Sequence, residues 1–222
     1  MPTTEMFAVQ LFRYPGSKAN PKALRQIKSL FPQSFKCYRE PFVGSGAIFW
    51  TIPITTKRWI NDYNRNLIAV YEALKARPKE FVERCNAIPP ATADEPMVTK
   101  RSGIRYPRRL LETFEQFKRD EGMDRALRYL FVNRCAWNGR VILDQKRLSR
   151  TYFSNPDGWN TELLDKLAEA AEIVAETKIT CSDFEELFDE PGDEVFIFAD
   201  PPYLNDTELD QSGKLYEHGF TM

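Results

Sequence analysis

The sequence of 222 residues contains a single histidine, His218, and four widely separated cysteines. The absence of paired histidines and of a Cys-x-x-Cys pair argues against a zinc site. The single histidine argues against Ser-His or Cys-His nucleophilic catalysis, unless His218 is the base. A signal-peptide pattern is also missing, so the single cysteines are expected to be reduced. No apolar run approaches the ~20 residues that a membrane helix needs. These absences predict a cytoplasmic protein with neither a metal site nor a membrane partner.

Neither sign of charge dominates the chain, because the formal net charge is −1. Positive charge is nevertheless concentrated in two stretches, residues 100–109 and residues 134–150. The aromatic residues Tyr106, Trp137 and Tyr152 are interleaved with or adjoin these cations. Basic stretches are most often solvated surface. Two of them together with aromatic residues are equally compatible with a nucleic-acid surface.

Short strand-like runs alternate with amphipathic helical patterns along the chain. Strands are expected at residues 35–42, 58–62, 178–181 and 195–199, and helices at residues 20–31, 44–51, 64–76, 107–119, 123–137 and 160–176. This order predicts an α/β fold, a parallel sheet flanked by helices. We expect residues 1–86 and 159–222 to form the core, and residues 87–158 to form an inserted helical and basic lobe.

The segment "EPFVGSGAIFW" (residues 40–50) places Gly44 and Gly46 between a strand and a helix, where a ligand can approach the backbone closely. An ordinary turn is the alternative, but Asp62 ends the next strand, where an acid can bind the two ribose hydroxyls of a nucleoside. No third glycine follows, which favours a nucleoside without a pyrophosphate. In "RYPGSK", Lys18 can meet a carboxylate and Tyr14 an apolar or cationic group of the same ligand. A nucleoside with an amino-acid tail is S-adenosylmethionine.

The segment "FIFADPPYLN" raises the question of why a buried strand, residues 195–199, ends on an acid, two prolines and an aromatic ring. An exocyclic amine on a flipped-out DNA base explains all of them. Asp200 can accept one N–H of the amine and the carbonyl of Pro201 the other, while Pro202 stiffens the backbone. Tyr203 can stack on the base. A strand-ending turn without function is the alternative.

Taken together, these segments make the chain resemble the Dam-like DNA adenine-N6 methyltransferases. The matching landmarks, in the family's order, are "RYPGSK", "EPFVGSG", "INDYNRNLI", "FVNRCAWNG", "CSDF" and "ADPPY". The resemblance implies a Rossmann-like, S-adenosylmethionine-dependent core with a target-recognition lobe inserted between the second and third strands. It also implies site-specific methylation of adenine N6 in double-stranded DNA, as in restriction–modification systems.

The resemblance carries over to particular residues of this chain. Tyr14 and Lys18 would contact the methionine part of the cofactor, Asp62 would bind its ribose, and Asp200 would lie beside both cofactor and target amine. The remaining members of the expected cofactor site are Glu40, Phe42, Gly44 and Gly46.

The DNA-binding residues are expected in the basic segment after "FVNRCAWNG". Trp137 stands just before Asn-Gly, where family members carry an aromatic residue that can wedge into the base stack. The other candidates, for phosphate or guanine contacts, are Asn138, Arg140, Lys146, Arg147 and Arg150. The hairpin "RVILDQKRLSRTYF" differs from that of GATC readers, so GATC is not predicted as the target.

Two other functions are compatible with the same fold. A cytosine-N4 methyltransferase uses the same flipped-amine geometry, although the aspartate that heads Asp-Pro-Pro-Tyr favours adenine. A catalytically inactive nucleic-acid-binding module is the second alternative, and the intact tetrapeptide argues against it. A dehydrogenase is disfavoured because the third glycine of its dinucleotide motif is missing.

The chain also predicts a continuation of its sheet. Only a short stretch follows Tyr203, and Thr221, a good N-cap, has one residue after it. A parallel sheet needs both edges and faces covered, so we expect the parent gene to encode roughly 50–80 further residues. The alternative is a compact variant that completes its sheet by dimerising.

Overall fold

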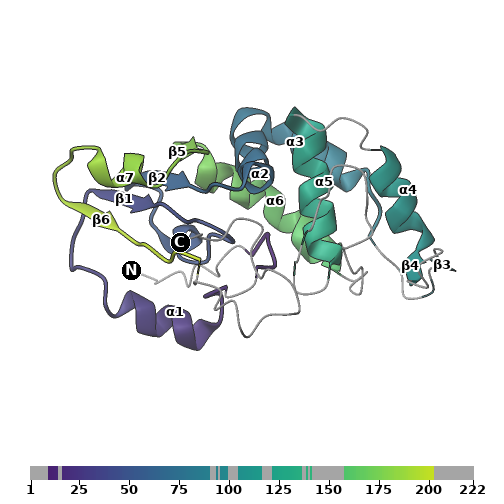
Figure 1. Ribbon diagram of the computed structural model, residues 1–222, viewed down its shortest axis with the longest axis horizontal. Coiled ribbons are helices and arrows are strands. Elements are labelled where there is room, and N and C mark those ends of the chain that lie inside the picture. Colours follow the sequence, from purple (N-terminus) through teal and green to yellow (C-terminus); the bar gives the residue numbers. More distant parts are fainter. Residues whose placement is uncertain are drawn as a thin grey trace, which may run out of the picture.

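The structure is a computed structural model, described here for residues 10–14, 17–90, 94, 96–99, 105–116, 122–136, 139, 141 and 158–202. Its centre is a four-stranded sheet in the order β5-β2-β1-β6, in which every neighbouring pair is parallel (Figure 1). The strands are β1 (Cys37–Glu40), β2 (Lys57–Asn61), β5 (Thr177–Thr180) and β6 (Val195–Ile197). The prediction of an α/β fold with a parallel sheet is therefore confirmed.

The register of these strands brings four chain segments to one edge of the sheet. Glu40 of β1 lies opposite Ile60 of β2, and Asn61 lies opposite Thr180 of β5. On the other side of β1, Arg39 lies opposite Ile197 of β6. The residues that follow each strand therefore emerge together at the carboxyl edge, which is where open α/β sheets bind ligands.

Polar side chains define where the helices begin. Asn20, Asn64 and Asn160 each accept hydrogen bonds from backbone N–H groups of the following first turn, as an N-cap does. The capped helices are α1 (Pro21–Lys28), α2 (Arg65–Ala76) and α6 (Thr161–Val174); the others are α3 (Pro78–Asn86), α4 (Arg108–Gln116), α5 (Gly122–Cys135) and α7 (Glu185–Asp189). None of the helices within the described ranges has the length and apolar character to cross a bilayer.

The helices α2, α3, α5 and α6 gather at one end of the sheet, whereas α1 lies apart from them on the side of β6 (Figure 1). α2 packs against α3, α5 and α6 and buries a row of apolar residues that includes Leu67, Val70 and Leu74. The division of the chain into a core and an insert at residues 87–158 stays a prediction.

An aromatic cluster attaches the N-terminal residues to this core. Phe12 is 0% exposed, and its ring centroid lies 5.4 Å from that of Tyr71. Tyr71 in turn stacks on Trp50 at 5.6 Å. Fully burying such side chains stabilises a fold by about 1.5–3 kcal/mol each. Residues 10–13 are therefore held firmly just before Tyr14.

The structure differs from the sequence-based expectations at three places. The helix expected at residues 44–51 is only a 3₁₀ turn, η1 (Phe49–Thr51), because Gly44 and Gly46 have φ values of +47° and +70°, outside the right-handed helical region. A short antiparallel pair, β3 (Met97–Thr99) and β4 (Arg105–Pro107), was not expected. The strand expected to be buried, β6, is half-buried.

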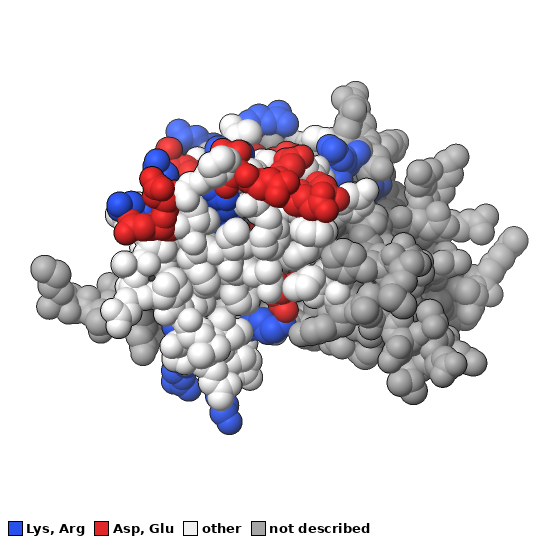
Figure 2. All heavy atoms as spheres, turned by 60° about the vertical axis from the view of Figure 1, so that its left-hand side comes forward, with Lys and Arg blue, Asp and Glu red and all other residues white. Residues whose placement is uncertain are grey.

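The exposure of β6 follows from its position at the edge of the sheet. β1 lies on one side of it, and within the described part of the chain no strand lies on the other. Figure 2 turns this side of the molecule forward and shows a broad area with few charged side chains between acidic groups above and basic groups below. Phe196 of β6 is partly covered by Phe31 and Phe35, whose ring centroids lie 4.6 and 5.1 Å away.

Candidate active site

An ion pair joins two distant segments at the carboxyl edge of the sheet. The β6 ladder extends to Phe198, whose N–H donates to the carbonyl of Arg39 at 2.9 Å, and Asp200 follows two residues later. Lys18 Nζ lies 2.6 Å from Asp200 Oδ2, and the two side chains are 26% and 32% exposed. Pro201 and Pro202 continue without regular secondary structure. The pair therefore fixes one oxygen of the Asp200 carboxylate while leaving the group accessible.

The glycine loop between β1 and η1 has a backbone that only glycine suits. Gly44 and Gly46 have φ values of +47° and +70°. A Cβ at Gly46 would lie 2.6 Å from Tyr71 Oη and 2.8 Å from Trp50 Nε1, so no side chain fits there. A Cβ at Gly44 would lie 3.5 Å from the ring of Tyr14, which places this ring against the loop.

Asp62 holds this loop through both of its carboxylate oxygens. Oδ2 accepts a hydrogen bond from Gly44 N–H and Oδ1 accepts one from Asn64 N–H, each at 2.9 Å. A carboxylate can accept about four hydrogen bonds, so this role is compatible with a ligand contact. The sequence suggested a ribose contact for Asp62 but gave no sign that the residue also shapes the glycine loop.

Glu40 is an unusually placed acid, 3% exposed at the end of β1. Tyr38 Oη donates a hydrogen bond to its Oε2 at 2.5 Å. Burial raises the pKa of Glu40 to about 8; the nearby charges of Asp200 and Asp62 also raise it, and the Tyr38 hydrogen bond opposes them. Glu40 is therefore mostly protonated at neutral pH, and the three acids at this edge do not all carry charge.

Aromatic rings also lie at this edge, and one of them was missed by the sequence reasoning. Phe42 follows β1, and its ring centroid lies 5.3 Å from that of Phe184, which precedes α7. Phe184 comes from "CSDF", which the sequence identified only as a family landmark. Because this segment follows β5, the rule that ligands bind beyond the carboxyl ends of parallel strands could have found it.

Asn61 is a second residue whose role the sequence did not indicate. Its buried amide Nδ2 donates to the carbonyls of Pro41 and Ser182, both at 3.1 Å. Its Oδ1 accepts from Thr180 Oγ1 at 2.8 Å and from Ser182 N–H at 3.0 Å. The side chain thus connects the ends of β1, β2 and β5.

The structure brings together all eight residues expected to bind cofactor. Those near the glycine loop or the Asp200 pair are Tyr14, Lys18, Glu40, Phe42, Gly44, Gly46, Asp62 and Asp200. The expected catalytic residues Pro201 and Pro202 directly follow Asp200, and the other expected residues lie outside the described part of the chain: Tyr203, Trp137, Asn138, Arg140, Lys146, Arg147 and Arg150. Within the described part, no cluster of His, Cys, Asp and Glu could hold a metal ion.

Comparison with known proteins adds a family and several relatives. The family model of the D12 class N6 adenine-specific DNA methyltransferases matches residues 14–221. The chain is 27% identical to the Type II methyltransferase M1.LlaDCHI of Lactococcus lactis, over 94% of this chain and 70% of that one. It is 28% identical to the Type II methyltransferase M.MjaIII of Methanocaldococcus jannaschii, over 92% and 73% of the two chains. The DNA adenine methylase of Haemophilus influenzae is 28% identical, over 80% and 58%.

The raised pKa of Glu40 predicts a specific pH dependence of stability. The unfolded side chain titrates near pH 4.5 and the folded one near pH 8, so between these values the folded chain binds more protons. The free energy of unfolding should therefore fall as pH rises through this range, by at most about 1.4 kcal/mol per pH unit from this group. Glu40→Gln should remove that part of the fall, as measured by urea unfolding from pH 4.5 to 8.5. Parallel pH profiles for the two proteins would contradict this assignment.

Proposed function

The chain belongs to the D12 class N6 adenine-specific DNA methyltransferases, and we propose that it transfers the methyl group of S-adenosylmethionine to an adenine flipped out of double-stranded DNA. Membership of this family makes the chain an enzyme that needs a methyl donor and a DNA substrate. The observation that carries the finer proposal is the meeting of the Asp200–Lys18 pair and the Asp62-held glycine loop at one sheet edge.

The residues at this edge fit the proposed cofactor. The backbone of the loop at Gly44 can lie against a nucleoside, while Asp62 offers carboxylate oxygens for its ribose hydroxyls. The absent Cβ of Gly46 instead leaves room for Tyr71 and Trp50. Phe42 and Phe184 offer aromatic surface for its adenine ring. When bound, S-adenosylmethionine supplies an electrophilic methyl group on a sulfonium.

Tyr14, Lys18 and Glu40 complete the proposed cofactor site. Tyr14 lies against Gly44, where it can cover the ligand at the loop. Lys18 carries a positive charge that can meet the ligand's carboxylate as well as Asp200. Glu40, mostly neutral at pH 7, can donate a hydrogen bond from its protonated carboxyl group.

Asp200 and the residues after it are proposed to hold the target amine. The Asp200 carboxylate accepts one N–H of the adenine amine and the Pro201 carbonyl accepts the other, which localises the nitrogen lone pair. Lys18 keeps the carboxylate oriented through its Oδ2 contact. Pro202 fixes the backbone after that carbonyl, and Tyr203 stacks on the base. Such preorganised acceptors need no covalent intermediate.

The DNA duplex is proposed to bind the segment that follows α5. Trp137 enters the base stack, and Asn138, Arg140, Lys146, Arg147 and Arg150 contact phosphates and base edges. The support is the arrangement of cations and aromatic residues in the sequence and the family's DNA substrate.

Product analysis tests the reaction itself. Wild-type protein incubated with DNA and S-adenosylmethionine should yield N6-methyladenine on mass spectrometry of the digested DNA. Asp200→Ala removes an acceptor for the target amine and should lower the rate by at least about 100-fold. The matched control is Asp193→Ala, which removes an exposed acid near the same strand. N4-methylcytosine as the product would make the adenine assignment wrong.

Cofactor binding is tested at Asp62. Asp62→Ala leaves the N–H groups of Gly44 and Asn64 without their acceptor and removes the proposed ribose contact. It should weaken S-adenosylmethionine binding by about 1–3 kcal/mol, measured by titration calorimetry. Glu72→Ala, at an exposed position on α2, should leave the affinity unchanged. Equal affinity in wild type and Asp62→Ala would refute the assignment.

DNA binding is tested by its dependence on salt. Replacing Arg147 and Arg150 together by glutamine should reduce the slope of log K against log salt concentration by about 1.8, if each residue meets one phosphate. The control replaces Lys57, the first residue of β2, and Lys79, in the first turn of α3, which are both exposed cations. A slope that is the same in all three proteins would make Arg147 and Arg150 solvated surface residues.

A further inference from the structure

Two adjacent residues near the end of α5, within "FVNRCAWNG", make hydrogen bonds that the proposed function does not use. Asn133 is 0% exposed. Its Oδ1 accepts from Arg13 N–H at 2.9 Å, and its Nδ2 donates to the carbonyl of Arg13 at 2.7 Å and to that of Gly139 at 3.0 Å. The amide thus binds the backbone of Arg13 as a neighbouring strand would, and joins it to Gly139.

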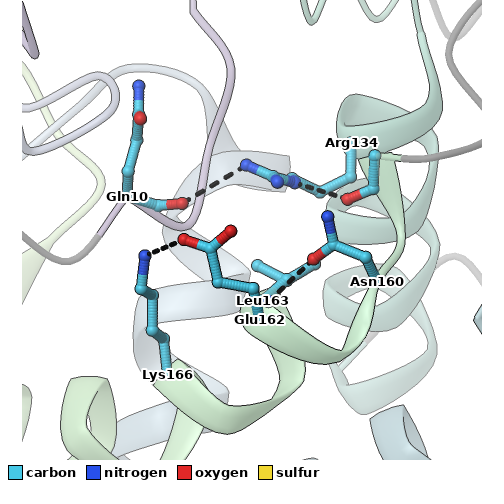
Figure 3. Close-up of polar contacts among 7 residues, drawn as sticks. Gln10, Arg134, Asn160, Glu162, Leu163 and Lys166 are labelled. Atoms are coloured by element: carbon cyan, nitrogen blue, oxygen red, sulfur yellow. Dashed lines mark hydrogen bonds and ion pairs between the residues drawn. The ribbon is translucent and has the colours of Figure 1, made fainter.

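Arg134 does the same for two other backbone positions. Its Nε donates to the carbonyl of Gly158 at 2.9 Å. Its Nη1 donates to the carbonyl of Gln10 at 3.3 Å (Figure 3). Burial, helped by the nearby charge of Arg13, lowers the pKa of Arg134 to about 10. The guanidinium therefore stays charged at neutral pH and keeps its donors.

The four positions that these side chains hold belong to only two parts of the chain. Gly139 and Gly158 bound the segment 140–157, which contains most of the proposed DNA contacts. Gln10 and Arg13 belong to the N-terminal stretch that leads directly into Tyr14 at the glycine loop. Asn133 attaches the first end of the segment to this stretch, and Arg134 attaches the second end.

Both ends of the segment are also rigid for reasons of their own. A Cβ at Gly139, which has φ +69°, would lie 1.9 Å from the carbonyl oxygen of Arg13, so the two backbones are in direct contact. At the other end, Trp159 is 0% exposed and its Nε1 donates to the carbonyl of Ile88 at 3.0 Å. Each end thus has a further contact with the core, and the two α5 residues connect both ends to the stretch that leads into the cofactor loop.

We propose that Asn133 and Arg134 are positioning residues that fix the DNA-contacting segment relative to the cofactor loop. This inference rests on the proposed function, in which the segment places the adenine and the loop places the methyl donor. Methyl transfer needs its two reacting atoms about 3–3.5 Å apart, and a displacement of 1 Å can cost about 100-fold in rate. Contacts that fix the relative position of the two parts act on the chemical step and not on either binding step.

The test uses Arg134 because it is partly exposed and its replacement leaves the core intact. Arg134→Met removes both hydrogen bonds but keeps an apolar side chain of similar length. It should lower kcat by about 10- to 100-fold, with KM for DNA and for S-adenosylmethionine changed less than about 3-fold. Arg134→Lys retains the charge and one donor and should recover part of the lost kcat. Asn133→Asp, which keeps the acceptor but loses both donors, should act in the same direction as Arg134→Met.

The matched control is Lys166→Met. Arg134 and Lys166 line one cleft, in which Lys166 pairs with Glu162 at 2.6 Å (Figure 3). Among the described residues, this pair makes no hydrogen bond to Gly139 or Gly158. Replacing Lys166 should leave kcat and both KM values unchanged.

Several outcomes would overturn the inference. An unchanged kcat for Arg134→Met would do so. A fall in kcat would also do so if it equalled the fraction of unfolded protein in thermal melts and was no longer seen at lower temperature. A loss confined to KM would make the contacts part of a binding site. If wild-type protein made no N6-methyladenine, the proposed function would fail and this inference with it; an active wild type and an equally active Arg134→Met would overturn the inference alone.

Discussion

The geometry of the candidate site depends on the hydrogen bonds of the buried Asn61 amide. This amide donates to the carbonyl after β1 and to that of Ser182, just past β5, and accepts from Thr180 in β5. Glu40, Asp62 and Phe184 all lie within a few residues of these contacts. Parallel strands bring such residues to one edge, but only a fixed spacing between strand ends makes them a site. Leaving this buried amide without hydrogen bonds would lower the stability of the fold by about 1–3 kcal/mol, which favours the arrangement in which all of its partners are in place.

Electrostatics at this edge follow from the same arrangement. Three carboxyl groups close together would repel one another if all were ionised. Burial keeps Glu40 mostly protonated, and Lys18 lies against Asp200. What remains is a modestly negative site, which is suited to a ligand that carries a sulfonium. The exposure of the Lys18–Asp200 pair also means that water and substrate can reach it.

Much of this fold and site could be predicted from the sequence, because the signals were local. The glycine loop, Asp62 and Asp200 each follow a strand-like run, and parallel strands bring such positions together. Phe184, which follows β5, could have been found by the same rule, whereas Asn61 and Asn133 could not. Their partners lie about 120 residues away or on another strand, and an asparagine that bonds backbone has no pattern of its own. The expected helix after the loop is reduced to a 3₁₀ turn because Gly44 and Gly46 take positive φ values, which the sequence alone does not reveal.

The choice between amide and carboxylate at these positions follows from their partners. Asn61 and Asn133 each face both carbonyls and N–H groups, so the side chain must donate and accept at once, which an amide does and a carboxylate does not. Asp62, which follows Asn61 in the chain, faces the N–H groups of Gly44 and Asn64, where two acceptor oxygens are needed. An exchange of the two side chains at 61 and 62 would place donors against donors and acceptors against carbonyls. Two chemically similar neighbours therefore have opposite requirements: residue 61 holds the strand ends together, and residue 62 shapes the loop that would receive the cofactor.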